Sequence, residues 1–496
     1  MSVDPRTPVL IGVGQLSHRV DRGATPLEPV DLMAEALRLA ATDSGAGTAT
    51  LARADSVQIV ATLSWRYRDP GRLVADRVGA QPRDSAVSGI GGNSPQSLVN
   101  AACLAIQRGE ADHVLIAGAE AWRTRMKERA AGERPDWTTQ GDDVPAARQA
   151  TPDVAMSAPA EQAVGVVAPI QVYPLIEQAF RIAQGRKLDE HLDALARLWS
   201  AFSEVAADNP HAWVQQRFTP EQLRSTDDGN RWVGFPYPKL MNSNPSVEQA
   251  AALILCSAER AAALGVPRDR WVFPHSGADA HDHYFVSERD SLGASPAIRL
   301  AGTAALSLAG VGPDDLSYVD LYSCFPCAVE VAATELGLSL DRPLTVTGGL
   351  SFAGGPWNNY VTHSIATMAG RLRADPDAVG LVTANGGFLT KHAIGVYAAH
   401  PPRAEFRYAE PQPEVDALPR RDGCSQLDVD ATIEAWTVMH DGAGQPETAH
   451  ITALLGDGRR GWATSTEADV LTTLMTEDVA AAPVRLQADG AFTLAP

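Results

Sequence analysis

The chain has 496 residues, 45% of them apolar and 20% charged, a composition that can bury the cores of two or three domains. Its formal net charge of −19 argues against a nucleic-acid-binding or anionic-membrane surface, because both need an excess of basic residues. The sequence shows neither a run of about eighteen apolar residues nor a basic-then-apolar leader, so we expect a cytoplasmic protein without a membrane segment. The five cysteines are scattered and odd in number, which predicts free thiols.

Strand-like and helix-like segments alternate in the N-terminal part of the chain. In chain order they are Thr7–Gly14 (strand), Pro29–Ser44 (helix), Ser56–Leu63 (strand), Gln96–Arg108 (helix) and His113–Glu120 (strand). The first strand closes in a Gly-x-Gly turn that lacks the third glycine of a dinucleotide fingerprint, so we do not interpret it as a nucleotide loop. The order of the segments predicts a mixed α/β layer.

From Trp122 to about Asn244 this regularity drops, and helical spacing is clear only near Gln171–Gly185 and Leu188–Ala207. Such a segment is typical of an insertion that covers one end of a sheet. The core pattern resumes at Val247–Ala263, and Trp271–Phe273 begins what resembles a second copy of the first half.

A hidden repeat supports this duplication. His113–Gly118 and Ala378–Gly386 are equivalent apolar strands that end in small residues, and each follows a helix entered through glycines. After Pro401–Pro402 the composition changes and short alternating strands follow, such as Ala431–Met439, which predicts a separate small β domain over residues 405–496.

Two motifs in the second half predict a ligand pocket. An apolar strand ends in Asp320–Phe325, and the glycine-rich turn Gly348–Pro356 then leads into a helix-like run over residues 358–373. Strand ends and a helix N-terminus that meet in one place form a pocket for an anionic or carbonyl ligand.

The order of these motifs resembles the C-terminal half of a thiolase, in which Asn-Glu-Ala-Phe or His-Asp-Cys-Phe precedes Gly-Gly-x-x-x-x-Gly-His-Pro. Here the motifs read Tyr322–Phe325 and Gly354–Pro356, and the first half aligns without a gap over Gly92–Glu120. The resemblance covers roughly residues 5–400 and identifies the chain as similar to sterol-carrier-protein-type thiolases and to thiolase-like proteins with an added C-terminal domain.

The resemblance implies an α/β fold with a duplicated five-layer αβαβα core and a small C-terminal β-barrel-like domain. Its parts are an N-terminal half (residues 1–260) that contains a loop domain at about 122–250, a C-terminal half (261–402) and the additional domain (405–496). Monomer and homodimer both stay open.

In a thiolase, one cysteine takes the acyl group, a histidine activates it, a second cysteine moves the α-proton, and the strand-end Asn or His holds the thioester oxygen. The corresponding positions here are Gly92, Gly355, the region of Ala384–Asn385, and Tyr322. All four differ, so we expect no chemistry through an acyl-cysteine. An oxyanion hole made by the N–H groups of Gly92 and Gly387 does not depend on side chains and is expected to remain.

We therefore predict Tyr322, His363 and Asn385 as catalytic candidates. A phenol donates a proton when its setting permits, and some thiolase-like aldolases are thought to use tyrosines, although a pocket-wall tyrosine is the alternative. His363 lies one helical turn after Asn359 and is a candidate for the missing base, or a structural histidine. The binding candidates are Gly92, Asn93, Ser94, Gly355, Gly387 and His392; without a base, Ser94 has no nucleophilic role.

Three further groups have plainer interpretations. Cys324 and Cys327 have the spacing of a redox pair, but a structural role is favoured. His281–Asp282–His283 has no matched distant pair of ligands, so we predict no metal site. Arg123, Arg125 and Lys127 suit either a coenzyme A diphosphate or a solvated face, and we favour the latter.

Two functions follow from these observations. The first is an enzyme that binds an acyl-CoA, the small-molecule coenzyme A thioester expected as ligand, and carries out acyl transfer or retro-aldol cleavage without a cysteine. The second is a non-catalytic coenzyme A ligand-binding or scaffold protein. We expect no covalently bound cofactor in either case.

Overall fold

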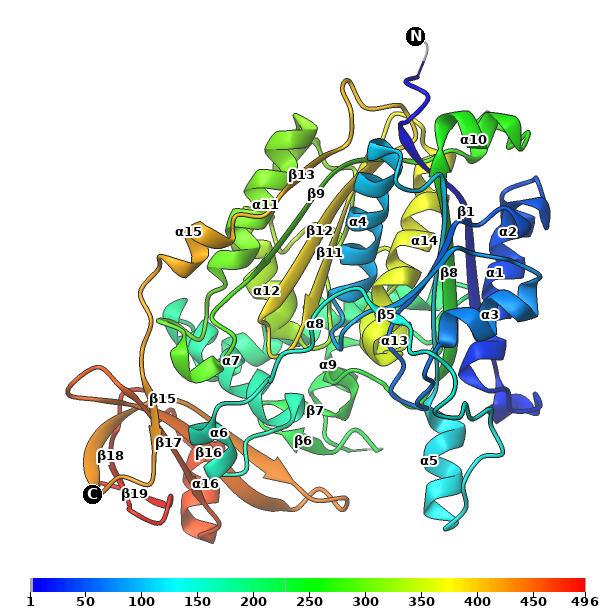
Figure 1. Cartoon of the computed structure of the whole chain (residues 1–496). Helices are drawn as coiled ribbons and strands as arrows, with labels where there is room; N and C mark the ends of the chain where they lie inside the picture. The colour runs from blue at the N-terminus through cyan, green and yellow to red at the C-terminus, as the bar shows by residue number, and fades with distance from the viewer. Residues whose placement is uncertain (1–2, 228, 496) are drawn as a thin grey trace.

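Two β-sheets form the core of the protein, and a pair of helices lies between them in the computed structural model, which describes residues 3–227 and 229–495 (Figure 1). In spatial order, the strands of the first sheet are β1 (Pro8–Ser17), β8 (Glu248–Ser257), β4 (His113–Ala121), β2 (Ser56–Ile59), β3 (Asp84–Val87) and β5 (Arg148–Gln149). Those of the second sheet are β10 (Tyr318–Asp320), β11 (Val379–Gly386), β12 (Lys391–Ala398), β9 (Phe273–His281) and β13 (Arg407–Ala409).

Helices on three levels complete five layers (Figure 1). The central helices α4 (Ser94–Arg108) and α14 (Tyr360–Ala374) pack against both sheets, and most of their residues are buried. The outer faces are covered by α1 (Pro29–Asp43), α2 (Ala49–Ala52) and α3 (Pro70–Val78) on the first sheet, and by α11 (Pro296–Ala309) and α12 (Pro326–Glu335) on the second. The predicted αβαβα core is confirmed.

The duplication is visible in the strand order. Each half contributes four strands in the same arrangement, β1-β8-β4-β2 in one sheet and β9-β12-β11-β10 in the other. In both halves the central helix lies, in sequence, between the two parallel strands of this set. Helix α4 comes between β2 and β4, and α14 comes between β10 and β11. The two halves therefore place equivalent strand ends at the same edge of the core.

Strand β1 is longer than predicted, and the predicted turn at Gly12–Gly14 is wrong. The strand continues through Gly12 and Gly14 to Ser17, so the Gly-x-Gly motif is not a turn. A Cβ atom on Gly14 would lie 2.7 Å from the backbone nitrogen of Ala40, and one on Gly12 would collide with the Ala40 carbonyl. The two glycines thus allow α1 to lie directly against the strand.

The inserted segment covers one end of the core (Figure 1). Its elements are α5 (Trp122–Ala130), α6 (Pro159–Ala163), α7 (Pro169–Ala183), α8 (Leu188–Asp208), α9 (Pro220–Arg224), β6 (Trp232–Gly234) and β7 (Tyr237–Pro238). Helix α7 packs against α12, and α8 packs against both α12 and α13 (Gly349–Phe352). The short helix α10 (Ala258–Ala263) follows β8.

A third sheet forms the C-terminal part. After α15 (Gln412–Asp416), its strands in spatial order are β14 (Gly423–Ser425), β17 (Arg460–Ser465), β16 (Pro446–Leu455), β15 (Val429–His440), β18 (Pro483–Leu486) and β19 (Phe492–Leu494), with α16 (Ala468–Thr476) beside them. Strand β6 of the insertion also pairs with β15, and an isolated bridge joins Thr464 to Ala491. No described helix is long and apolar enough to cross a bilayer.

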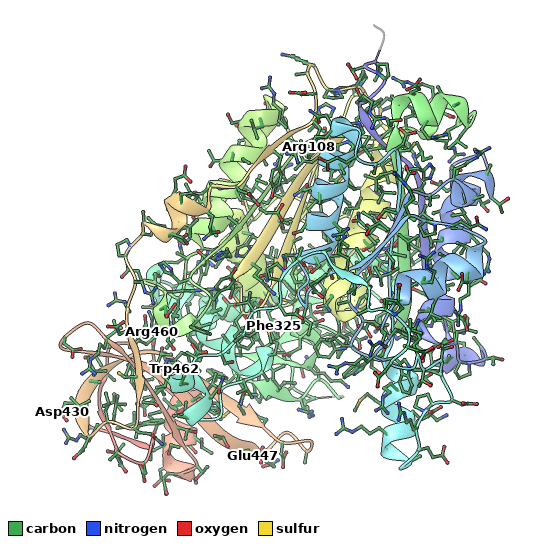
Figure 2. All side chains as sticks on the ribbon, viewed as in Figure 1. Arg108, Phe325, Asp430, Glu447, Arg460 and Trp462 are labelled. Carbon is green, nitrogen blue, oxygen red and sulfur yellow. The ribbon has the colours of Figure 1, made fainter. Side chains whose placement is uncertain are left out.

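A buried arginine fastens this sheet to the core. Arg460 donates two hydrogen bonds to the Glu434 carboxylate, at 2.6 and 2.7 Å, and further ones to the carbonyl oxygens of Val286 and Ser287. Trp462, two residues along β17, donates to the Ser287 hydroxyl at 2.9 Å (Figure 2 labels both side chains). The buried charge-assisted hydrogen bonds from Arg460 to the core carbonyl groups thus join the C-terminal sheet to the core.

We predict that Arg460→Met lowers the free energy of unfolding by about 3–5 kcal/mol, because it leaves Glu434 and the carbonyl groups of residues 286, 287, 289 and 290 without this donor. Urea unfolding followed by tryptophan fluorescence measures this change. The matched control is Arg485→Met, which removes only the exposed pairs with Asp428 and Asp430 and is expected to leave the transition unchanged. Equal effects of the two substitutions would contradict the assignment.

Candidate functional site

The end of strand β10 is organised by one buried carboxylate. Asp320 accepts hydrogen bonds from the backbone N–H of Val346, at 2.8 Å, and from the hydroxyl of Ser364, at 2.7 Å. It also accepts from the hydroxyls of Thr345, Thr347 and Tyr360. Burial raises the pKa of Asp320, while the hydrogen bonds act in the opposite direction. The strand end, the glycine-rich turn and helix α14 are therefore tied together at this residue.

Tyr322 follows two residues later and reaches the loop before α4. Its ring packs edge-on against Tyr360, with 5.6 Å between centroids, and its hydroxyl has no hydrogen-bond partner among the described residues. A Cβ atom on Gly92 would collide with this hydroxyl and would lie 2.7 Å from Cζ of the same ring. The phenol of Tyr322 thus occupies the space into which a side chain at position 92 would extend. Burial holds the pKa of Tyr322 well above its usual value, so the group is a neutral donor.

Asn385, at the end of β11, is held by a tyrosine of the inserted segment. Its Nδ2 donates to the hydroxyl of Tyr173 at 2.9 Å, and its Oδ1 is buried without a partner among the described residues. The same hydroxyl lies 3.3 Å from the Gly387 carbonyl and accepts from the Leu389 N–H at 3.0 Å. Tyr173 also stacks on Phe325, with 4.5 Å between centroids, so α7 is anchored at this strand end.

His392 forms a buried cluster with Asp282 and Ser295. Its Nε2 lies 3.4 Å from Oδ2 of Asp282 and 3.2 Å from Oγ of Ser295. Ser295 in turn donates to the Asp282 carboxylate, which also accepts from the Ala297 N–H at 3.1 Å. The imidazole is therefore fixed in orientation by a carboxylate and a hydroxyl.

These three side chains meet at one small cavity. Tyr322, Asn385 and His392 line it together with apolar residues of α11, α12, β12 and the turn after β11, namely Ile298, Ala328, Ala332, Leu389 and Ile394, and with Thr383 and Ala384. The structure thus brings together two of the predicted catalytic candidates and one of the predicted binding candidates.

The predicted backbone donors lie beside this group. A Cβ atom on Gly386 would lie 3.2 Å from the Gly92 nitrogen, which shows that the loop before α4 touches the end of β11. Among the described residues, neither the Gly92 nor the Gly387 N–H donates a hydrogen bond. Neither glycine is among the residues that line the cavity shared by Tyr322, Asn385 and His392.

The neighbours of Gly92 have structural roles. Ser94 is the first residue of α4 and donates to the Gly89 carbonyl at 2.9 Å. Asn93 contacts the Ser97 hydroxyl through Nδ2, and its Oδ1 is buried without a partner among the described residues. At Gly355 a Cβ atom would collide with the hydroxyl of Ser243, so the inserted segment fills the direction of a histidine there.

His363 lies in a different place. Its Nδ1 is 3.0 Å from Oε1 of Gln15, and it lines a cavity with His211 and Gln249 rather than the one with Tyr322. Burial lowers the pKa of His363 to about 3, so the ring is neutral. The geometry does not bring this histidine to the other candidates.

The remaining predicted groups are also placed. Cys324 and Cys327 are buried free thiols, and burial raises the pKa of Cys324 to about 12, which disfavours a redox pair. Of the His281–Asp282–His283 run, only Asp282 joins the His392 cluster. The basic residues of α5 face outward, with Arg125 at the rim of a pocket that also contains Arg134 and Trp65.

Two residues of the site escaped the sequence reasoning. Tyr173 lies in the inserted segment within an ordinary helical pattern, and Asp282 stands in the His281–Asp282–His283 run, which resembles a set of metal ligands. A polar residue at the end of the second sheet's first strand was the signal that would have pointed to Asp282, because strand ends of both halves meet at one edge.

We predict that Gly92→Ala destabilises the protein by about 1–3 kcal/mol, because the added methyl group meets the Tyr322 hydroxyl and the Asn385 carbonyl. The double variant Gly92→Ala/Tyr322→Phe is expected to recover part of the loss, since the hydroxyl is gone while Cζ of the ring and the Asn385 carbonyl remain close. Thermal unfolding measures both, with Gly442→Ala as the control at an open position. A Gly92→Ala variant as stable as the parent would disprove the close approach.

Comparison with known proteins shows where these features recur. Residues 410–491 match the family described as the thiolase-like protein type 1 additional C-terminal domain. Over all of both chains, the protein is 33% identical to a monomeric SCP2-thiolase-like protein type 1 from Mycobacterium smegmatis, with a TM-score of 0.84. An Ltp2–ChsH2(DUF35) aldolase shares the fold over 80% of this chain and all of that chain, at 21% identity and a TM-score of 0.60.

Part of the chain is also similar to two archaeal acetyl-CoA acetyltransferases. The one from Methanocaldococcus jannaschii is 26% identical over 34% of this chain, and the one from Methanothermobacter thermautotrophicus is 25% identical over 35%. The matches span 40% and 47% of these relatives, so the chain matches less than half of their length.

Proposed function

The chain belongs to the thiolase superfamily, as an SCP2-thiolase-like protein type 1 with an additional C-terminal domain, and we propose that it binds an acyl thioester of coenzyme A beside the contact between Gly92 and Tyr322. The thioester oxygen accepts hydrogen bonds from the N–H groups of Gly92 and Gly387. Tyr322 stands beside it as a neutral phenol. The reaction is acid–base chemistry on the thioester or its β-carbon, without an acyl-enzyme.

One observation carries this proposal: the Tyr322 hydroxyl lies where the side chain of residue 92 would be, next to an N–H group that has no acceptor. A hydroxyl at that point faces the atoms that a nucleophile would attack. A phenol with a raised pKa donates a hydrogen bond or a proton to a developing oxyanion or alkoxide. The missing thiol is thus replaced by a proton donor.

The cysteines support a reaction without a covalent intermediate. Position 92 is glycine, and burial raises the pKa of the neighbouring thiols Cys324 and Cys327, which suppresses the nucleophilic thiolate. Retro-aldol cleavage needs a proton moved at a β-hydroxyl and an enolate stabilised at the thioester oxygen, and both roles have candidates here. A protein of the same fold is named an aldolase.

The second candidate is ligand binding without turnover. It is favoured by the position of His363, which contacts Gln15 and does not line the Tyr322 cavity, so this candidate base is absent there. In this case the protein binds an acyl-CoA without turnover, and the C-terminal domain docks a partner.

We further propose that the protein is a monomer. Strand β5 of the inserted segment pairs with β3 and so covers the edge of the first sheet, where a second chain would otherwise add its strand. The relative from Mycobacterium smegmatis is described as monomeric.

We predict that Tyr322→Phe keeps acyl-CoA affinity within a few-fold but lowers turnover about 10²–10⁴-fold, because only the proton donor is lost. Isothermal titration with butyryl-CoA measures binding, and chromatography of a β-hydroxyacyl-CoA panel measures turnover. The control is Tyr318→Phe, whose hydroxyl contacts only the exposed Asp375.

The possible results distinguish the two candidate functions and test the role of Tyr322. A parent protein that binds no acyl-CoA contradicts the proposal as a whole. Binding without turnover on any thioester supports the second candidate, and equal turnover by Tyr322→Phe removes the tyrosine from the mechanism.

A further inference from the structure

The site lacks a base at the positions where a thiolase has one. One histidine, His392, lies beside the position of the second thiolase cysteine, which moves the α-proton. That cysteine position falls near Ala384–Asn385, and the residue paired with Asn385 across the β11–β12 ladder is His392. We propose that His392, oriented by Asp282, is the base of this site and takes the α-proton of a bound acyl thioester. The inference rests on the proposed function and adds the residue that activates the substrate carbon.

The ladder places the imidazole on the correct side of the sheet. Residues directly opposite each other in an antiparallel pair project their side chains from the same face. Asn385 and His392 accordingly line the same cavity, and the Tyr322 ring lines it from the end of β10. An acyl group that enters this cavity would therefore have its α-carbon near both a phenol and an imidazole.

The hydrogen bonds of His392 define which nitrogen is available. Nε2 faces the Asp282 carboxylate at 3.4 Å and the Ser295 hydroxyl at 3.2 Å, so this nitrogen carries the proton. Nδ1 has no hydrogen-bond partner among the described residues. A histidine that donates from one nitrogen to a buried carboxylate presents the lone pair of the other, as a general base requires.

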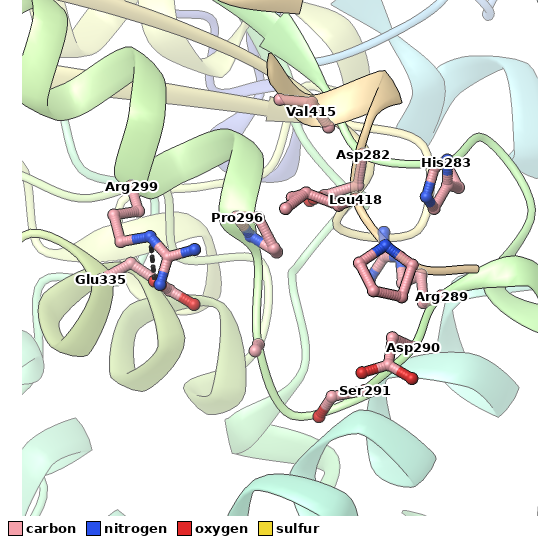
Figure 3. A pocket seen from close by; sticks show the side chains of 12 residues that line it. Asp282, His283, Arg289, Asp290, Ser291, Pro296, Arg299, Glu335, Val415 and Leu418 are labelled. Atoms are coloured by element: carbon pink, nitrogen blue, oxygen red, sulfur yellow. Dashed lines mark ion pairs between the residues drawn. The ribbon is translucent and has the colours of Figure 1, made fainter.

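The surroundings of Asp282 favour its charged form. It accepts hydrogen bonds from Ser295 and from the Ala297 N–H at the start of α11. Burial acts to raise the pKa of Asp282, but the hydrogen bond from His392 and the charge of Arg289 lower it overall. Figure 3 shows Asp282 and Arg289 among the side chains that line a second pocket, together with His283 and Asp290.

Arg289 also fixes the turn that precedes His392. Its Nη2 donates to the carbonyl oxygens of Phe388 and Leu389 and to the Thr390 hydroxyl, and its side chain is buried. The turn between β11 and β12 is thus held from outside, while Tyr173 holds it from the inserted segment through the Leu389 N–H. Both contacts limit the movement of the imidazole relative to Asn385.

The proposed step balances without any co-reactant. The Cα–H bond of the acyl group breaks, the proton moves to Nδ1, and the electron pair becomes the enolate π bond with its charge on the thioester oxygen. The N–H groups of Gly92 and Gly387 stabilise that charge. Return of the proton regenerates the thioester, so in D₂O the α-hydrogens exchange for deuterium.

Deuterium exchange into butyryl-CoA therefore tests the inference directly. The parent protein in D₂O is expected to exchange the α-hydrogens, followed by proton NMR, while His392→Asn lowers the rate about 10²-fold or more. Titration calorimetry is expected to give a butyryl-CoA affinity within a few-fold of the parent. His18→Asn, a surface histidine that contacts the Thr25 carbonyl, is the matched control and is expected to exchange at the parent rate.

Asp282→Asn tests the positioning role. Nitrogen-15 NMR of labelled histidine is expected to show the Nε2–H tautomer of His392 in the parent and a mixed tautomer in this variant, together with slower exchange. An unchanged tautomer with slow exchange would reduce Asp282 to a merely structural residue and would overturn its part of the inference.

The outcomes separate this inference from the proposed function. Binding of butyryl-CoA without exchange in the parent, or undiminished exchange in His392→Asn, overturns the base and leaves the binding proposal intact. No binding by the parent overturns both. If His392→Asn does not fold, His392→Gln, which keeps a polar amide near Asp282, serves as the second variant with the same expected loss.

Discussion

The close approach between Gly92 and Tyr322 is the constraint on which the rest of the site depends. Because residue 92 has no side chain, a phenol hydroxyl can lie against the loop before α4, and the Gly92 N–H in that loop has no acceptor among the described residues. Asp320 fixes the strand end from which Tyr322 projects, and Tyr360 supports the ring from its edge. A larger residue at position 92 and the present position of Tyr322 exclude each other, so the two residues form one structural unit.

Much of the fold follows from the sequence because the core is periodic. Apolar strands and central helices recur in both halves, and the structure shows them in the same order, with His113–Ala121 and Val379–Gly386 as equivalent strands. The Gly12–Gly14 pair was misinterpreted as a turn because glycine permits both a turn and close helix packing, and only the tertiary structure decides between them. Likewise β6 joins the C-terminal sheet from far away in the chain, which local patterns do not indicate.

The sequence indicates some residues of the site but not others, and the difference has a physical reason. Tyr322 and Asn385 lie at one cavity, as expected for residues at the ends of neighbouring strands in matching motifs. His363 was misplaced because helical spacing specifies a face but not the neighbour of that face, which is Gln15. Tyr173, Asp282 and the orientation of His392 depend on contacts between segments separated by about a hundred residues or more, and no single stretch of sequence carries them.

The central claim is that a thioester carbonyl is polarised by the Gly92 and Gly387 N–H groups beside the Tyr322 hydroxyl. Carbon-13 NMR of butyryl-CoA labelled at the thioester carbonyl measures this polarisation directly. The account predicts a bound resonance shifted downfield from that of free butyryl-CoA, with a smaller shift in the Tyr322→Phe variant, because one donor is removed. A bound resonance at the frequency of the free thioester, or no bound resonance at saturating protein, would contradict it.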